Sequence, residues 1–389
     1  MNNRILFVSS LEGWGGSEEL WSRAAVNLIA EGFNVSASVV KEPQPHKRVL
    51  DLIRRGIDVR FCPKQYSRLE RVWRRARSKP LFTLVGETER MIATRSPSLI
   101  VLSDGGPFLD PGLLEMCIEK CVPFVTIGHA NWEGMWPGDE DAARYRATLG
   151  KALRCYFVSK ANMQLAEKQL GVELPNAEVV WNPFNVNYNT APIWPRFAGG
   201  DQLLLACVAR LDPRAKGQDL LFEALAGPKW AARNWRLALY GEGPMRDGLE
   251  RLAQRLGLPS EKVVFAGHRE VEEIWRSNHV LVMPSRFEGL PLAMVEAMLC
   301  ARPVVATNVA GHMEILQDEV TGFIADAPTS PSVALALERM WINRSRLEDM
   351  GKAGAKRIRS LVPADPAKVF AEKLKSLFLC PPYPRSGLV

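Results

Sequence analysis

The chain has 389 residues, a formal net charge of +7, 24% charged residues and 47% hydrophobic residues. This length suits two domains that each bury a core, and the composition excludes a disordered or fibrous chain. No stretch approaches the roughly 18 consecutive apolar residues that a membrane-spanning helix needs. The seven cysteines are scattered, without the second pair of a zinc site, so we expect reduced thiols in a cytoplasmic protein.

The first predicted strand, residues 4–8, leads through a glycine-rich turn into a helix predicted over residues 17–31. Ser17 is a suitable N-cap for this helix. A strand, a glycine-rich turn and a helix together present backbone N–H groups to phosphate in many α/β folds. Gly15 and Gly16 in the turn are therefore candidate phosphate-binding residues, although any tight turn would also favour glycine there.

Residues 47–79 hold twelve Lys/Arg against three Asp/Glu, a local charge of +9 that exceeds the charge of the whole chain. Within this basic segment, residues 65–78 are predicted to form a helix with five arginines around an apolar stripe that includes Trp73. A charge run is usually a solvated face, but this composition also fits anionic lipid head groups or a phosphate-bearing acceptor. No nucleic-acid-binding motif accompanies it, so we expect no nucleic-acid partner.

Two further predicted strands, residues 99–102 and 123–127, end in polar side chains that include Asp104 and His129. Ligands of open α/β sheets bind at the carboxyl ends of strands, which makes both side chains site candidates. A lone histidine is more often structural. The acidic run at residues 139–141 lies at a predicted helix start, where acids are favoured anyway, and we do not read it as a metal site.

The predicted domains are residues 1–184 and 201–365, joined by a polar, proline-rich linker at residues 185–200. Residues 366–389 contain a last helix and a loose tail.

The second domain opens with a predicted strand, then Arg210 and Lys216 in a loop, then a helix from Gln218. Two cations beside a helix N-terminus suit a diphosphate leaving group, because negative charge develops there as a glycosidic bond breaks. Surface salt bridges are the plainer alternative. Gly241 and Gly243 begin a G-x-G-x-x-G pattern, but its third glycine is missing, which weighs against a dinucleotide fingerprint.

A predicted strand at residues 279–283 leads into a tight loop with Glu288 and a helix with Glu296. The helix opens near Pro291, runs to about Ala301 and is apolar nearly all round, so it should be buried. A carboxylate there is costly unless something binds it. The helix start also offers backbone N–H groups for an anion; Pro291 has none, so these belong to Gly289, Leu290 and Leu292.

The pattern Glu288-Gly-Leu-Pro-Leu-Ala-Met-Val-Glu296 resembles the Glu-x7-Glu signature of retaining GT-B glycosyltransferases, most closely family 4, the glycosyl transferases group 1. The spacing from Arg210 to Lys216 and the Gly15-Gly16 loop resemble the same family. The resemblance covers roughly residues 4–378. It departs from the family at Asn182-Pro183, where Asn-Gly is usual.

The resemblance implies an α/β protein of GT-B type, with two doubly wound Rossmann-like domains facing a central cleft and the last helix crossing back to the first domain. It also implies a retaining transfer of a sugar from a nucleoside-diphosphate sugar to an acceptor hydroxyl, with no metal or other cofactor. The expected acceptor is a glycan or lipid-linked molecule of bacterial cell-surface polysaccharide or glycolipid synthesis. We expect a cytoplasmic protein that contacts the inner face of the membrane through its basic segment.

The resemblance also assigns roles to the candidate residues. Glu288 is expected to contact the donor sugar and His129 to face it, both as catalytic residues. Glu296 is expected to bind the ribose diol, since a carboxylate accepts from two adjacent hydroxyls. The backbone around His268 and Arg269 is expected to hold the nucleobase. The donor diphosphate is expected at Gly15, Gly16, Arg210, Lys216, Gly289, Leu290 and Leu292.

Three alternatives stay open. An NAD-dependent oxidoreductase predicts a complete glycine fingerprint and an acid about 20 residues further on. A nucleotide-sugar epimerase of related fold, or a sucrose-synthase-like transferase, would share much of the site. A catalytically silent binding protein of the same fold would tolerate loss of Glu288, Arg210 or Lys216, and all three are present.

Overall fold

The computed structural model describes residues 3–62, 83–196 and 202–379. The helix predicted over residues 65–78 lies outside the described residues. None of the described helices is long and apolar enough to cross a membrane.

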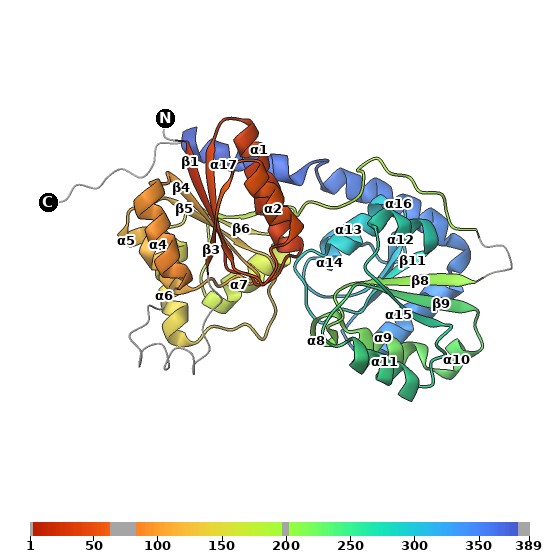
Figure 1. Ribbon diagram of the computed structural model, residues 1–389. Coiled ribbons are helices and arrows are strands. Elements are labelled where there is room, and N and C mark those ends of the chain that lie inside the picture. The colour runs from red at the N-terminus through yellow and green to blue at the C-terminus, as the bar shows by residue number, and fades with distance from the viewer. Residues whose placement is uncertain (1–2, 63–82, 197–201, 380–389) are drawn as a thin grey trace. The chain divides into compact units, whose positions relative to one another are not determined.

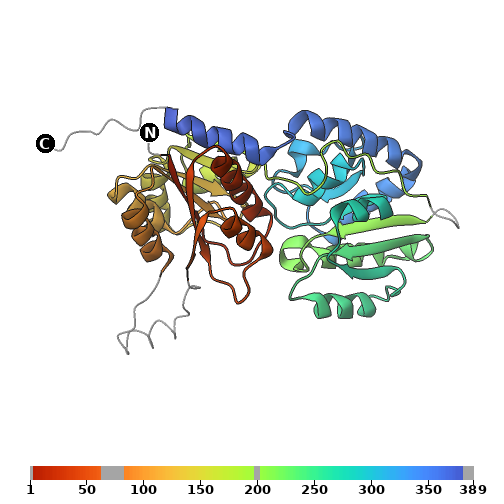
Figure 2. The same cartoon turned by 45° about the horizontal axis from the view of Figure 1, so that its top comes forward.

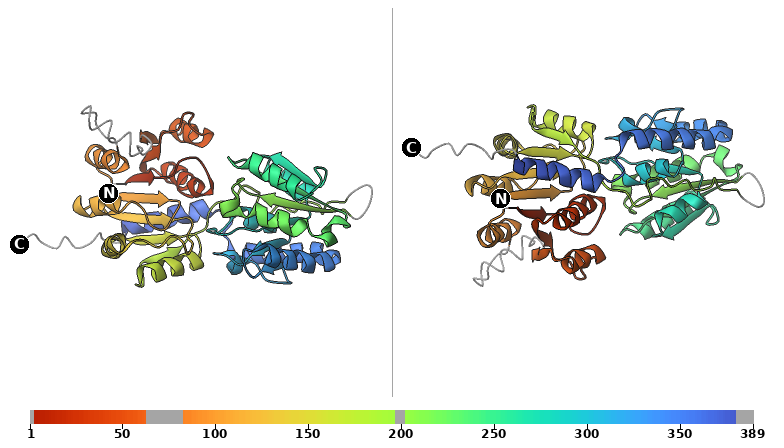
Figure 3. Two further views of the ribbon diagram at one scale, coloured as in Figure 1. Left: turned by 90° about the horizontal axis from the view of Figure 1, so that it is seen from below. Right: turned by 90° about the horizontal axis from the view of Figure 1, so that it is seen from above.

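The chain forms two compact units, Met1–Pro183 with Asp365–Val389, and Phe184–Ala364 (Figure 1). Each unit contains one sheet of parallel strands with helices on both of its faces, as Figure 3 shows. The predicted α/β class, with two doubly wound Rossmann-like domains, is confirmed.

The first unit is built on a seven-stranded sheet whose strands alternate their side chains between two apolar cores. Ile5 and Phe7 pack into one core, and Leu6 and Val8 pack into the other, as the two-residue period of a strand requires. In sheet order the strands are β3 (Asp58–Cys62), β2 (Asn34–Val40), β1 (Arg4–Ser9), β4 (Leu99–Asp104), β5 (Phe124–Gly128), β6 (Arg154–Phe157) and β7 (Ala177–Val179).

Helices cover the two faces of this sheet. One core receives side chains from α1 (Gly16–Ala30), α2 (Lys47–Arg54) and the last helix, α17 (Pro366–Leu379). Figure 2 shows α17 lying beside α1. The other core receives side chains from α4 (Leu84–Arg95), α5 (Pro111–Glu119), α6 (Asp139–Leu149) and α7 (Lys160–Leu170).

The second unit has a six-stranded sheet in the order β10 (Val263–Gly267), β9 (Trp235–Tyr240), β8 (Leu203–Val208), β11 (Val280–Met283), β12 (Val304–Thr307) and β13 (Gly322–Ala325). Its helices are α8 (Pro213–Lys216), α9 (Gln218–Leu225), α10 (Pro228–Ala231), α11 (Arg246–Arg255), α12 (Val271–Ser277), α13 (Leu292–Leu299), α14 (His312–Ile315), α15 (Ser330–Ile342), α16 (Leu347–Leu361) and the 3-10 turn Arg344–Arg346.

Most of residues 185–200, predicted as a linker, are described and belong to the second unit. Arg359 donates to the carbonyl oxygens of Tyr188 (2.9 Å) and Thr190 (2.8 Å), and Arg302 donates to that of Ile193 (2.8 Å). Two arginines therefore hold this irregular segment against the second unit through its backbone.

Both sheets have a topological switch point, where the strand order reverses. In the first sheet it lies between β1 and β4, and in the second between β8 and β11. In open α/β sheets the crevice outside the strand ends at such a point is the usual place for a ligand. The candidate residues that follow β1, β4, β8 and β11 all gather at these two places.

Some element boundaries differ from the predictions. The prediction of Ser17 as an N-cap is wrong: α1 starts at Gly16 with Gly15 as its N-cap, and the Ser17 hydroxyl donates instead to the neighbouring Glu18 carboxylate. Helix α13 ends at Leu299, two residues before the predicted end. The short helix α8 was expected to be a loop.

Candidate active site

A partly buried ion pair forms the centre of the second unit's switch point. Lys216, the last residue of α8, places its Nζ 2.7 Å from Oε1 of Glu288, which lies in the loop between β11 and α13. The hydroxyl of Ser285 donates to the same oxygen at 2.9 Å. Burial raises the pKa of Glu288, but Lys216 and the Ser285 hydrogen bond hold that pKa below its usual value. The carboxylate is therefore ionised at neutral pH.

Gly217 lets the two halves of this pair meet. Its φ of +65° is a left-handed conformation, and a Cβ atom there would lie 2.0 Å from the carbonyl oxygen of Pro284. Only glycine lets the loop after α8 approach the end of β11 so closely. The Lys-Gly sequence thus has a packing reason as well as a place in the family motif.

Arg210, the other predicted diphosphate-binding cation, does not join this ion pair. It follows β8, its side chain is 64% exposed, and it pairs with Asp212 at 3.2 Å. Arg214 pairs with the same carboxylate at 3.0 Å and holds the pKa of Asp212 below its usual value. An exposed guanidinium beside a helix start is available to an incoming anion, at the loss of a weak surface contact.

The start of α13 offers a second set of groups for an anion. The first N–H groups of a helix have no partner within it, and Pro291 provides no side-chain cap. The N–H groups predicted for this role belong to Gly289, Leu290 and Leu292, next to the Lys216–Glu288 pair in sequence. The partial positive charge of these N–H groups acts on an anion together with the charge of the Lys216 ammonium group.

Glu296 on α13 is buried and partnered inside the second unit. Its Oε1 accepts from the backbone N–H of Asn185 at 2.8 Å and from the Asn185 side-chain amide at 3.2 Å. These hydrogen bonds offset the free-energy cost of burying a carboxylate on an apolar helix. The expected ribose contact stays a prediction, and a ribose would share this carboxylate with Asn185.

A histidine that sequence analysis missed completes the polar network. His312, fully buried at the start of α14, donates from Nδ1 to the Thr307 carbonyl oxygen at 2.7 Å. The Thr307 hydroxyl in turn donates to the Ser285 carbonyl oxygen at 2.6 Å. Nε2 of His312 is buried and has no hydrogen-bond partner among the described residues. Burial lowers the pKa of His312, so the ring is neutral beside the ion pair.

His268 and Arg269 follow β10 and are exposed at the carboxyl edge of the same sheet. Their predicted contact with a nucleobase stays a prediction. The glycines after β9 have a packing role: a Cβ atom at Gly241 would lie 2.2 Å from the carbonyl oxygen of Ala209, and one at Gly243 would lie 2.5 Å from that of Leu211. They bring two loops together, which explains them without a dinucleotide.

The first unit's switch point holds neutral and weakly acidic groups. His129 follows β5, is buried, and shares a hydrogen bond of 3.1 Å between Nε2 and the Ser103 hydroxyl. Burial lowers the pKa of His129 to about 3, an effect that Asn182 partly opposes. Asp104, at the end of β4, accepts from the Ser10 hydroxyl at 2.7 Å, and burial raises its pKa.

The predicted glycine loop after β1 meets α1 as expected. Gly15 is the N-cap in an extended conformation, with no side-chain cap, and Gly16 opens the helix. Their backbone therefore lies at the carboxyl edge of the first sheet, beside the switch point. Binding of a diphosphate by Gly15 and Gly16 stays a prediction.

The fold is that of the GT-B class. HepE of Anabaena, solved in complex with UDP, matches with a TM-score of 0.73 over 96% of this chain and 100% of its own, at 19% identity. Sucrose-phosphate synthase from Thermosynechococcus elongatus also matches with a TM-score of 0.73, over 97% and 99% of the two chains, at 18% identity.

Sequence comparison adds a match to a family model. Residues 194–357, less than half of the chain, match the model of the glycosyl transferases group 1. A GDP-mannose-dependent alpha-(1-6)-phosphatidylinositol monomannoside mannosyltransferase of Mycolicibacterium smegmatis is 34% identical over 170 residues, which are 41% of this chain and 44% of the relative. The chain thus spans less than half the length of the curated relatives it matches.

Proposed function

We propose that the protein is a retaining glycosyltransferase that moves a sugar from a nucleoside-diphosphate sugar to an acceptor hydroxyl. The observation that carries the proposal is the partly buried Lys216–Glu288 pair beside an uncapped helix start, at the switch point of the second sheet. The family match over residues 194–357 supports it. The mannosyltransferase relative is named for a GDP-sugar, and the HepE structure contains UDP, so both bases belong in a test.

The proposed chemistry uses the charges of the second unit. Lys216 and Arg210, with the N–H groups at the start of α13, stabilise the diphosphate as the bond from its oxygen to the anomeric carbon breaks. The acceptor oxygen bonds to that carbon on the same face, and its proton passes to the departing diphosphate. Glu288 contacts the sugar hydroxyls and stabilises positive charge on the ring. The cations take the place of a metal ion in this scheme.

The remaining assignments fit the local chemistry of each residue. A neutral His129 suits a hydrogen bond to an uncharged sugar, because its lowered pKa keeps it unprotonated at neutral pH. Glu296 suits the ribose diol, and the backbone near His268 and Arg269 suits the base. Gly15 and Gly16 would contribute backbone N–H groups to the diphosphate.

We infer that the acceptor is a glycan or lipid-linked molecule, and that the protein works in the cytoplasm at the inner face of a bacterial membrane, in cell-surface polysaccharide or glycolipid synthesis. On α2, Leu50 and Ile53 are exposed on a helix that also carries Lys47 and Arg54. Basic residues beside exposed apolar ones suit an anionic lipid surface. Binding to phosphatidylglycerol vesicles that Ile53→Glu leaves unchanged would contradict this part.

The test of the function is a transfer assay with GDP- and UDP-sugars and glycolipid acceptors. The expected result is release of a nucleoside diphosphate with formation of a glycoside, whose anomeric configuration in the proton NMR spectrum equals that of the donor. An inverted product would contradict the retaining mechanism. Failure to consume any nucleotide sugar would contradict the proposal as a whole.

A further inference from the structure

His312 has a polar atom that no role above uses. The side chain is fully buried at the start of α14, and its Nε2 has no hydrogen-bond partner among the described residues. Nδ1 donates to the Thr307 carbonyl oxygen at 2.7 Å, and a carbonyl oxygen only accepts, so Nδ1 carries the proton of the neutral ring. Nε2 is therefore a bare acceptor. Buried polar atoms without a partner are rare in folded proteins, and this one lies beside the ion pair.

A chain of hydrogen bonds connects His312 to that ion pair. Thr307, whose carbonyl oxygen accepts from the ring, donates from its hydroxyl to the Ser285 carbonyl oxygen at 2.6 Å. The Ser285 hydroxyl donates in turn to Oε1 of Glu288 at 2.9 Å, and Lys216 contacts the same oxygen. The histidine and the carboxylate thus belong to one polar network.

The backbone joins the two groups a second time. The N–H of Gly311, the residue before His312, donates at 3.2 Å to the carbonyl oxygen of Gly289, the residue after Glu288. The start of α14 and the loop after β11 are therefore connected through the main chain as well as through side chains. This double connection fixes the imidazole ring relative to the carboxylate.

The charge of the ring depends on both members of the ion pair. Burial lowers the pKa of His312, the negative charge of Glu288 opposes that effect, and the positive charge of Lys216 adds to it. The neighbouring elements carry two further charged side chains, Glu314 on α14 and Arg357 on α16. Arg357 donates to the Glu314 carbonyl oxygen at 3.0 Å. Since the charges of Lys216 and Glu288 cancel, the buried ring stays neutral.

A bound diphosphate would change this balance. Its negative charges would lie beside Lys216 and compensate the positive charge that disfavours a cationic ring. The net charge near His312 would then be negative, which favours the imidazolium form. A proton on Nε2 would also turn this bare acceptor into a donor, the kind of group that a carboxylate binds.

We propose that His312 is a positioning residue of the transfer reaction. As the diphosphate binds Lys216, Nε2 of His312 takes up one proton from solution, and the imidazolium then holds the Glu288 carboxylate in place for the donor sugar. The only bond formed is this N–H bond, and its positive charge offsets one negative charge of the diphosphate. The proposal rests on the proposed function, because it requires a nucleotide at Lys216.

Calorimetric titration of the full chain with GDP and with UDP tests the proton uptake. Titrations at pH 7 in HEPES and in Tris give the number of protons bound, because the two buffers differ in ionisation enthalpy. His312→Asn keeps a side-chain N–H for the Thr307 carbonyl oxygen but lacks Nε2. We expect the wild type to take up about one proton more per bound nucleotide than this variant. Its Kd should also rise up to about tenfold more than that of the variant between about pH 6.5 and 7.5.

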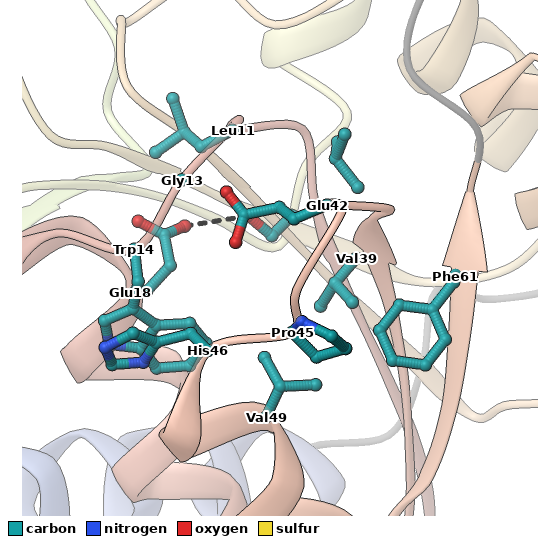
Figure 4. Close-up of a pocket in the computed structure, with 12 residues that line it drawn as sticks. Leu11, Gly13, Trp14, Glu18, Val39, Glu42, Pro45, His46, Val49 and Phe61 are labelled. Atoms are coloured by element: carbon teal, nitrogen blue, oxygen red, sulfur yellow. Dashed lines mark hydrogen bonds between the residues drawn. The ribbon is translucent and has the colours of Figure 1, made fainter.

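A histidine of the first unit provides the matched control. His46 is the N-cap of α2, and Figure 4 shows its ring stacked on Trp14, with centroids 5.1 Å apart. Asparagine is also a favoured N-cap residue, so His46→Asn removes an imidazole without removing the cap. This variant should bind the same nucleotide with the proton uptake of the wild type.

Nitrogen-15 NMR of the histidine rings provides a measurement that needs no variant. At pH 7 one ring of the wild type should change from the neutral to the imidazolium form as the nucleotide saturates the chain. Nucleotide binding without this new imidazolium, or with equal proton uptake in the wild type and His312→Asn, would overturn the inference and leave the proposed function standing. Binding of neither GDP nor UDP would contradict the proposed function, and the inference with it.

Discussion

The two switch points of this molecule have opposite electrostatic characters. In the second unit, Lys216 and Glu288 form a partly buried ion pair. This pairing holds the pKa of the Glu288 carboxyl group below its usual value. In the first unit, burial outweighs the hydrogen bonds that oppose it: it lowers the pKa of His129 and raises those of Asp104 and Glu18. Similar parallel sheets therefore place charge at one crevice and suppress it at the other.

The difference follows from the partners that each side chain has. Glu288 has an ammonium group at 2.7 Å, whereas the hydrogen-bond partners of His129 are the neutral Ser103 hydroxyl and Asn182 amide. Charged groups suit a diphosphate, and neutral donors and acceptors suit sugar hydroxyls. In the proposed reaction the cations of the second unit thus stabilise the leaving group, and the neutral His129 of the first unit hydrogen-bonds to the uncharged sugar.

Removing the charge at Glu288 should have the largest effect on the difference between the two switch points. Glu288→Gln leaves the Lys216 ammonium without its counter-ion, and we expect roughly a 10³-fold loss in kcat and about 3 kcal/mol of lost stability. Initial rates and denaturant unfolding measure the two effects.

The stability that the Glu288 charge contributes should depend on pH. Because the pKa of Glu288 is lower in the folded chain than in the unfolded chain, this contribution is full above the unfolded pKa. It is lost as the pH falls through the folded pKa. Glu250→Gln, in an exposed pair with Arg246, is the control and should change little.

The geometry that brings the pair together can be disturbed separately. Gly217→Ala would place a Cβ atom 2.0 Å from the Pro284 carbonyl oxygen, in a left-handed conformation. We expect a loss of about 3 kcal/mol, from strain together with the backbone shift. Gly171→Ala is a matched control: its φ is +66° and nothing lies within 4 Å, so only the conformational cost of about 1 kcal/mol should remain. Equal losses in the two variants would contradict the close approach.

The neutral half of the comparison predicts a pH dependence. The folded pKa of His129 is about 3 against an ordinary 6.5, so the unfolded chain binds a proton in that interval that the folded chain does not. Stability should therefore fall as the pH drops from 6.5 toward 3. His129→Gln should remove about 1.4 kcal/mol per pH unit from that slope, as calorimetry at pH 6 and pH 5 would measure. An unchanged slope would show that His129 is protonated in the folded state.

The smallest expected effect concerns the ribose contact. Glu296→Gln keeps an oxygen that can accept from the Asn185 N–H, so stability should change by less than about 1 kcal/mol. Loss of the charged acceptor should raise the Kd for a nucleoside diphosphate about tenfold, as calorimetric titration would show. An unchanged Kd would mean that Glu296 serves only to hold Asn185.

The sequence predicted the helices and strands well where their positions depend on local residue patterns. The predicted strands over residues 4–8 and 99–102 start where they were predicted, as does the helix from Gln218. Lys216 and Glu288 were both identified from motifs, but their pairing across 72 positions depends on how α8 packs against the end of β11.

Contacts set by tertiary packing were missed. His312 is a single histidine at the start of α14, and its contact with the Thr307 carbonyl oxygen and its place beside the ion pair depend on tertiary packing. Asn185 was placed in a linker, yet it is the partner of Glu296 from 111 positions away. Ser17 was predicted as the N-cap of α1 because serine is a favoured N-cap residue. Its hydroxyl instead donates a hydrogen bond to the adjacent Glu18 carboxylate.

The central claim is that Lys216 holds a nucleoside diphosphate at the second unit's switch point. A thermal-shift screen with GDP, UDP and their sugars on the wild type, Lys216→Ala and Lys229→Ala tests it directly. Lys229 lies on α10, at the opposite edge of the sheet, and is the control. We expect at least one nucleotide to stabilise the wild type and the control equally, by ligand linkage, and to lose most of its effect in Lys216→Ala. A full shift in Lys216→Ala, or no shift with any nucleotide in the wild type, would contradict the claim.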